Sequence, residues 1–161
     1  MTENVLRRIL PGRIDNHFRG YRAALWLFVP VVCMRLGISL LHIFYADGGA
    51  QSVSTIPLDT YPHGAAQNVV ALFARMGLEQ FLFALFCVLA LVRYRALIPL
   101  MYALLALNAV ATRGLAYLKP LALAGASTAR NPGLVLTILT ITGLVLSLLG
   151  RGYREDDGAR P

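Results

Sequence analysis

The sequence predicts an all-α membrane protein, a transmembrane four-helix bundle. Of its 161 residues, 57% are hydrophobic and only 14% are charged, and the mean hydropathy is +0.62. Soluble domains have about 45–50% apolar residues and about a quarter charged residues, so this chain is too apolar to be one. The same apolar content excludes a disordered chain.

Four apolar segments supply the predicted spans. They cover residues 21–45, 65–92, 97–118 and 133–149. A helix rises about 1.5 Å per residue, so about 20 residues cross a hydrocarbon core about 30 Å thick. The first three segments reach this length, and the fourth, with about 17 residues, lies at the short end of the spanning range. Gly and Pro residues punctuate the connections between them, which favours four separate helices.

The basic residues predict the orientation of these spans. Ten of the 15 Lys and Arg residues lie before or at the start of the first span, in the turn between the second and third spans, or after the fourth: Arg7, Arg8, Arg13, Arg19, Arg22, Arg93, Arg95, Arg151, Arg154 and Arg160. The two other loops hold only Lys119 and Arg130. This is the positive-inside asymmetry, which predicts that both termini are cytoplasmic (N-in, C-in).

The resulting organisation has three parts in the cytoplasmic (inner) membrane. Residues 1–20 form a basic juxtamembrane segment, residues 21–149 the membrane domain, and residues 150–161 a cytoplasmic tail. The lipid bilayer is the expected partner. A nucleic-acid partner is not expected, because it needs a clustered soluble basic face with stacking aromatic residues.

Ionisable side chains inside the spans are the candidates for a site. Each costs about 2.5–3.5 kcal/mol at the centre of a span, so such residues usually face the interior of a bundle and find partners there. Counted from the cytoplasmic end, Arg35 and Glu79 both lie about 20 Å into the membrane. We therefore expect one polar ligand-binding cluster, made up of Arg35, Arg75, Glu79 and Asn108, with His42 and Arg113 above it.

This cluster is open to three interpretations. Its three arginines and one glutamate leave a formal charge of +2. Such an excess is costly in a low dielectric, so something anionic, aqueous or headgroup-like is expected nearby, and a binding site for a small anionic or quinone-like amphiphile is one interpretation. Ion pairs that only fix the register of the helices are the structural alternative, and a proton-coupled or transport role is the third. We predict no catalytic residues and no metal ligands.

Short motifs add a family resemblance. The first span reads Met34-Arg35-Leu36-Gly37, the second contains Gly77-Leu78-Glu79, and a basic turn, residues 93–95, precedes the third. Over residues 25–118 the chain resembles the DoxX-like family of four-helix membrane proteins. Some members of that family resemble a small subunit associated with thiosulfate:quinone oxidoreductase. The resemblance implies that Arg35 and Glu79 occupy recurrent polar positions and that a quinone is a candidate cofactor.

The functional expectation is a non-enzymatic integral membrane protein, either an accessory subunit or a binder of a small anionic or quinone-like amphiphile. The alternative is a membrane component of a quinone-linked oxidoreductase in which Glu79 relays protons. The fourth span carries a face of small residues, which packs either inside the bundle or against a partner subunit or second copy: Thr140, Gly143, Ser147 and Gly150.

Overall fold

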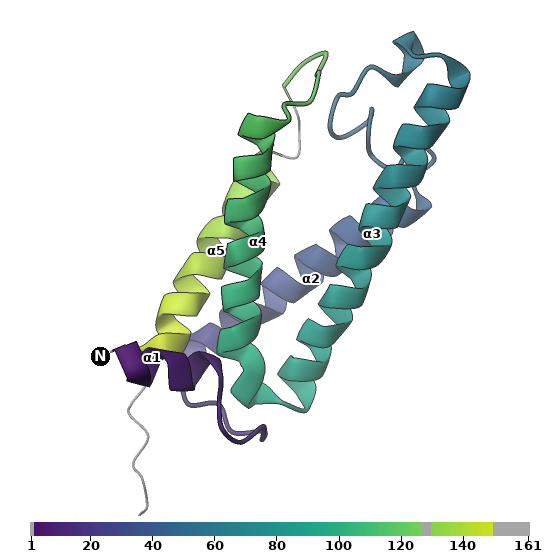
Figure 1. Ribbon diagram of the computed structural model, residues 1–161. Helices are drawn as coiled ribbons and strands as arrows, with labels where there is room; N and C mark the ends of the chain where they lie inside the picture. Colours follow the sequence, from purple (N-terminus) through teal and green to yellow (C-terminus); the bar gives the residue numbers. More distant parts are fainter. Residues whose placement is uncertain (1, 127–129, 150–161) are drawn as a thin grey trace, which may run out of the picture.

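The computed structural model describes residues 2–126 and 130–149, and four long helices dominate it (Figure 1). They are α2 (Arg22–Phe44), α3 (His63–Val92), α4 (Ile98–Leu118) and α5 (Arg130–Leu148). All four are long and apolar enough to cross a membrane, α4 together with the short helix η2 (Arg95–Leu97) that precedes it. The all-α class and the four predicted spans are thus confirmed, with helix bounds within three residues of the prediction. The predicted tail, residues 150–161, lies outside the described residues.

The helices do not pack equally in all directions. Helix α2 packs most extensively against α3 and also against α5, and α5 in turn packs against α4. Helices α3 and α4 follow each other in the sequence, but they meet mainly near their connecting turn and diverge toward the other end (Figure 1). Helix α3 is therefore covered mainly by α2 and makes little contact with α4.

Small residues determine which face of α3 meets α2. The buried positions of α3 are Gly77, Ala84, Cys87 and Ala90. A Cβ atom at Gly77 would lie 2.6 Å from the Cβ of His42 and 3.0 Å from the carbonyl oxygen of Ser39, both on α2. Small residues allow the two backbones to come this close, which is how helices gain packing energy in a membrane.

Tyr102 of α4 lies where α4 packs against both α2 and α5. It is fully buried, its hydroxyl donates a 2.8 Å hydrogen bond to the carbonyl oxygen of Ala24, and its ring stacks edge-on against Phe28 with 4.9 Å between centroids. Gly143 of α5 lies directly against the ring, so that a Cβ atom there would overlap it. The small face of the fourth span is thus used within the chain at this point, while Gly150 lies outside the described residues.

The N-terminal segment, predicted only as basic and juxtamembrane, begins with a short helix, α1 (Thr2–Ile9), and closes one end of the bundle. The Arg8 guanidinium donates a hydrogen bond to the carbonyl oxygen of Leu148, in the last turn of α5. The backbone N–H of Tyr21 donates a 3.2 Å hydrogen bond to the carbonyl oxygen of Leu146. A cation at a helix C-terminus is favourable, because it faces carbonyl groups that lack partners within the helix.

A folded loop, residues 45–62, closes the opposite end and includes a short helix, η1 (Leu58–Thr60). Gly48 and Gly49 have positive φ angles of 60° and 77°, a conformation that side chains disfavour. Ile56 and Leu58 are buried and pack with Phe73 and other apolar residues of α3. The loop is thus held by a small apolar core of its own.

Candidate functional site

Arg35 is one of two residues of the predicted set that face the interior, and His42 is the other. It lies in the middle of α2, on the face that buries Phe28, Val31, Ser39 and His42. Its side chain is partly buried. Its Nε atom is fully enclosed and has no hydrogen-bond partner, the one such side-chain atom in the described part of the chain. An enclosed guanidinium N–H without a partner needs an anion, a polar group or water.

Among the residues that the structure describes, no acidic side chain pairs with Arg35. Within residues 2–126 and 130–149, the side-chain ion pairs are Asp15–Arg19 and Arg75–Glu79. Cys87 of α3 lies close enough to interact with Arg35 electrostatically, but it is a buried free thiol. The positive charge of Arg35 is therefore not balanced by the neighbouring helices.

Glu79 does not join Arg35, contrary to the predicted cluster. The positions of the two residues along their helices agree with the prediction, but Glu79 does not lie on the face of α3 that meets α2. Gly77 faces α2, and Glu79 follows two residues later, about 200° further around the helix. Glu79 and Arg75 consequently lie on the outer side of α3, with side chains 72% and 78% exposed. They pair with each other instead, and 3.9 Å separate Arg75 Nε from Glu79 Oε1.

Asn108 and Arg113 also remain outside an interior cluster, and both are exposed on α4. The hydroxyl of Thr112 donates a 3.1 Å hydrogen bond to Asn108 Oδ1. Arg113 donates to the carbonyl oxygen of Ala109 over 3.2 Å and to the hydroxyl of Thr137, on α5, over 3.1 Å. Arg113 therefore ties α4 to α5 rather than contributing to a site around Arg35.

His42 is the sixth predicted site residue, and it is buried on the same face of α2 as Arg35. Its Nδ1 lies 2.7 Å from the carbonyl oxygen of Gly48. Since a carbonyl only accepts, Nδ1 carries the proton in this contact. The ring stacks edge-on against Phe73 of α3, with 5.6 Å between centroids. His42 thus anchors the loop after α2 and links it to α3.

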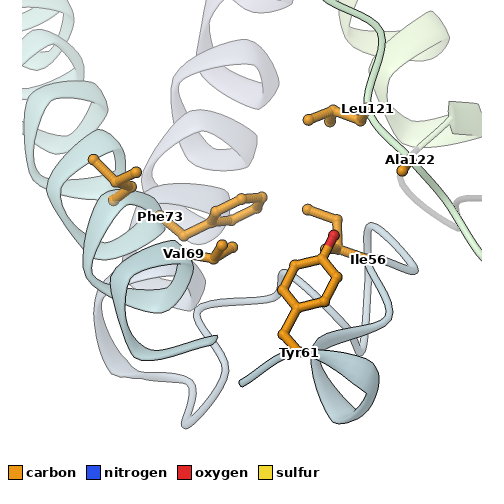
Figure 2. A pocket seen from close by; sticks show the side chains of 7 residues that line it. Ile56, Tyr61, Val69, Phe73, Leu121 and Ala122 are labelled. Carbon is orange, nitrogen blue, oxygen red and sulfur yellow. The ribbon is translucent and has the colours of Figure 1, made fainter. Parts of the chain in front are cut away.

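An apolar pocket that the sequence did not predict lies between this loop, α3 and the segment after α4 (Figure 2). Its volume is about 220 Å³, larger than the engineered apolar cavity of about 150 Å³ that holds benzene. Figure 2 shows Val69 and Phe73 of α3 facing Leu121, with Ile56 and Tyr61 on the loop side. Apolar residues in a Pro-bounded loop, Ile56 and Leu58, were the signal available in the sequence.

Asp47 organises the loop below this pocket. Its carboxylate accepts hydrogen bonds from the backbone N–H groups of Gly49, Gln51 and Ser52, and from the Ser52 hydroxyl. Burial raises the pKa of Asp47, but these hydrogen bonds outweigh it, and the pKa is lower than that of a free aspartate. The loop is therefore held by an ionised carboxylate at neutral pH.

Comparison with known proteins adds no relative. No protein-family model matches the chain, and neither a curated protein nor a solved structure matches it. The resemblance to the DoxX-like family therefore stays a prediction that rests on the motifs around Arg35, Glu79 and the basic turn. In the described residues, no group of three or more His, Cys, Asp and Glu side chains is arranged to hold a metal ion.

Proposed function

We propose that this chain is a non-enzymatic integral membrane protein that binds the acidic headgroup of a small amphiphile at Arg35. The observation that carries the proposal is the enclosed Nε atom of Arg35, which has no hydrogen-bond partner. A guanidinium offers five N–H donors in a planar fork, which fits a carboxylate or phosphate with two parallel hydrogen bonds. Such a ligand supplies both the missing charge and the missing acceptors.

Of the two predicted ligand classes, an anionic headgroup fits Arg35 better than a quinone. A quinone carbonyl accepts a hydrogen bond but carries no charge, and no carboxylate in the described part of the chain pairs with Arg35 to balance its charge. A buried charge without a counter-charge is costly. Because Glu79 lies on the outer side of α3, it supports no proton relay at Arg35, and the quinone-linked oxidoreductase component stays the untested alternative.

The sparse contact between α3 and α4 supports entry of the ligand from the membrane. Helices α3 and α4 diverge away from their connecting turn, and the apolar pocket lies at that wider end (Figures 1 and 2). An acyl tail is the apolar partner that such a pocket accepts. In this proposal the headgroup binds at Arg35 and the tail extends toward the residues around Phe73.

The proposed orientation has both termini in the cytoplasm of a cell whose inner membrane holds the protein. Its support is the gathering of arginines at one end: the segment before α2 and the turn at residues 93–95 lie at the same end of the helices (Figure 1). Cytoplasmic loops carry such an excess of basic residues. The loop of residues 45–62 then faces outward.

Native mass spectrometry of the purified protein tests the ligand. Three probes are added separately: oleate, phosphatidylglycerol and decylubiquinone, with phosphatidylcholine as the neutral reference. We expect oleate or phosphatidylglycerol adducts on the wild type and a loss of about 10- to 100-fold in Arg35→Gln, because two charge-assisted hydrogen bonds disappear. Arg35→Lys keeps the charge and retains part of the binding.

The control is Arg22→Gln, which removes the same charge from the exposed first residue of the same helix. It should bind the probes like the wild type. Equal adducts on the wild type and Arg35→Gln would contradict the proposal. A preference for decylubiquinone that depends on Arg35 would favour the oxidoreductase alternative instead.

A further inference from the structure

The outer face of α3 carries a regular exposed stripe. Its members are spaced by four, three, four and three residues, and all are exposed: Arg75, Glu79, Leu82, Phe86 and Leu89. This spacing keeps side chains on one face of a helix and is the repeat by which paired helices interlock. We call this stripe the α3 seam. It lies away from the small residues through which α3 meets α2.

The charges of the α3 seam are incompletely satisfied within one chain. Glu79 lies 13 residues before Val92, the end of α3, or about 20 Å along a helix that spans the membrane. Water is scarce at that depth, so polar groups there normally face protein. The 3.9 Å contact between Arg75 and Glu79 uses little of the hydrogen-bonding capacity of either group. Arg75 and Glu79 therefore need a second polar surface to complete their hydrogen bonds.

We propose that the α3 seam binds a second copy of this chain, with Arg75 of each copy paired to Glu79 of the other. The seam carries one charge of each sign, so it is complementary to itself. In a twofold contact, residue i of one copy meets residue j of the other, and the reverse. Two arginines and two glutamates then form a neutral group, shielded from lipid by both helices.

Membrane insertion makes this pairing geometrically simple. Both copies enter the bilayer in the same orientation, so the two α3 helices run parallel and like residues lie at equal depth. Arg75 and Glu79 differ in height by four residues, about 6 Å, and an arginine side chain can span this between helices as it does within one. Leu82, Phe86 and Leu89 continue the contact below the charged group.

Two charge variants test the pairing between copies. Arg75→Glu gives the seam two acidic residues, and Glu79→Arg gives it two basic residues. Two copies of the same variant therefore repel each other. The fraction of dimers is measured by single-molecule photobleaching in liposomes at low protein-to-lipid ratio. We expect dimers of the wild type, a loss of about tenfold or more in the dimerisation constant of each variant, and recovery in an equal mixture of the two. Neither variant can form the pair within its own chain, so recovery requires pairing between copies.

Cysteine cross-linking provides a test that leaves the charges intact. In a background in which Cys33 and Cys87 are replaced by alanine, Leu82→Cys places a thiol in the α3 seam. Ile138→Cys, 63% exposed on α5, is the matched control on another helix. Disulfide-linked dimers should form with Leu82→Cys and not with Ile138→Cys. This result decides the proposal even if the charge variants fail to fold.

Three outcomes would overturn the proposal. They are a wild type that is monomeric in the liposomes, a mixture of charge variants that dimerises no better than either variant alone, and cross-linking through Ile138→Cys rather than Leu82→Cys. A seam covered by lipid headgroups or by a different protein would produce the first outcome. The binding of an amphiphile at Arg35 is independent of this result, because Arg35 faces the interior from α2.

Discussion

Replacement of Arg35 by methionine separates a binding role from a structural one. The Nε atom of Arg35 is enclosed and has no hydrogen-bond partner, and leaving such a group unsatisfied costs about 1–3 kcal/mol. Methionine is flexible enough to fill the same space without a polar group. If the side chain is reserved for a ligand, Arg35→Met should raise the free energy of unfolding of the ligand-free protein by about 2 kcal/mol.

The melting temperature of delipidated protein in detergent measures this change. For a chain of 161 residues, an increase of about 2 kcal/mol corresponds to roughly 4–8 °C. Oleate at about 100 times its dissociation constant should add about 2.7 kcal/mol of stability to the wild type and none to Arg35→Met. Arg22→Met, at the exposed start of α2, should change little. A fall in the melting temperature of Arg35→Met would refute the reasoning, because it would show that Arg35 stabilises the protein without a ligand.

Three further predictions concern the packing, the loop and the orientation. Gly143→Ala should lower the free energy of unfolding by about 1–3 kcal/mol, measured by steric trapping, because the added methyl group meets the ring of Tyr102. Asp47 has a lowered pKa, so its stabilisation of the loop should be complete above about pH 4 and disappear as the pH falls through its folded value. Hydrogen exchange at residues 49–52 measures this, and Asp47→Ala should lack the protection at every pH. A membrane-impermeant thiol reagent should label Gln51→Cys from outside intact cells and label Asn16→Cys only after lysis, in a background without other cysteines; the reverse pattern would invert the proposed orientation.

The sequence predicted the spans well because their signal is local. Length and hydropathy alone place four helices, and the bounds of α2 differ from the predicted 21–45 by one residue at each end. Helix α1 was missed because eight residues are too few to form a stable helix alone, and its position depends on contacts with α4 and α5. The pocket depends on Leu121 and Ala122 lying against residues 56–73, which are distant from them in the sequence.

The predicted polar cluster failed on the choice of face. The expectation that Arg75 and Glu79 face the interior was wrong, because Gly77 and Ala84 determine the face of α3 that approaches α2. In a membrane, small residues lie where two helices pack closely. Polar residues can instead lie on a different surface that binds another partner. Arg35 was placed correctly in the interior because Phe28, Ser39 and His42 on α2 share its face.

The hydrogen bond from Arg8 to Leu148 has a consequence for biosynthesis. Arg8 leaves the ribosome long before the last turn of α5 has been synthesised. The N-terminal segment therefore cannot close the bundle until the final helix is in place. An N-terminal fusion that pulls this segment away should therefore leave insertion of the early helices intact and weaken the anchoring of the last one.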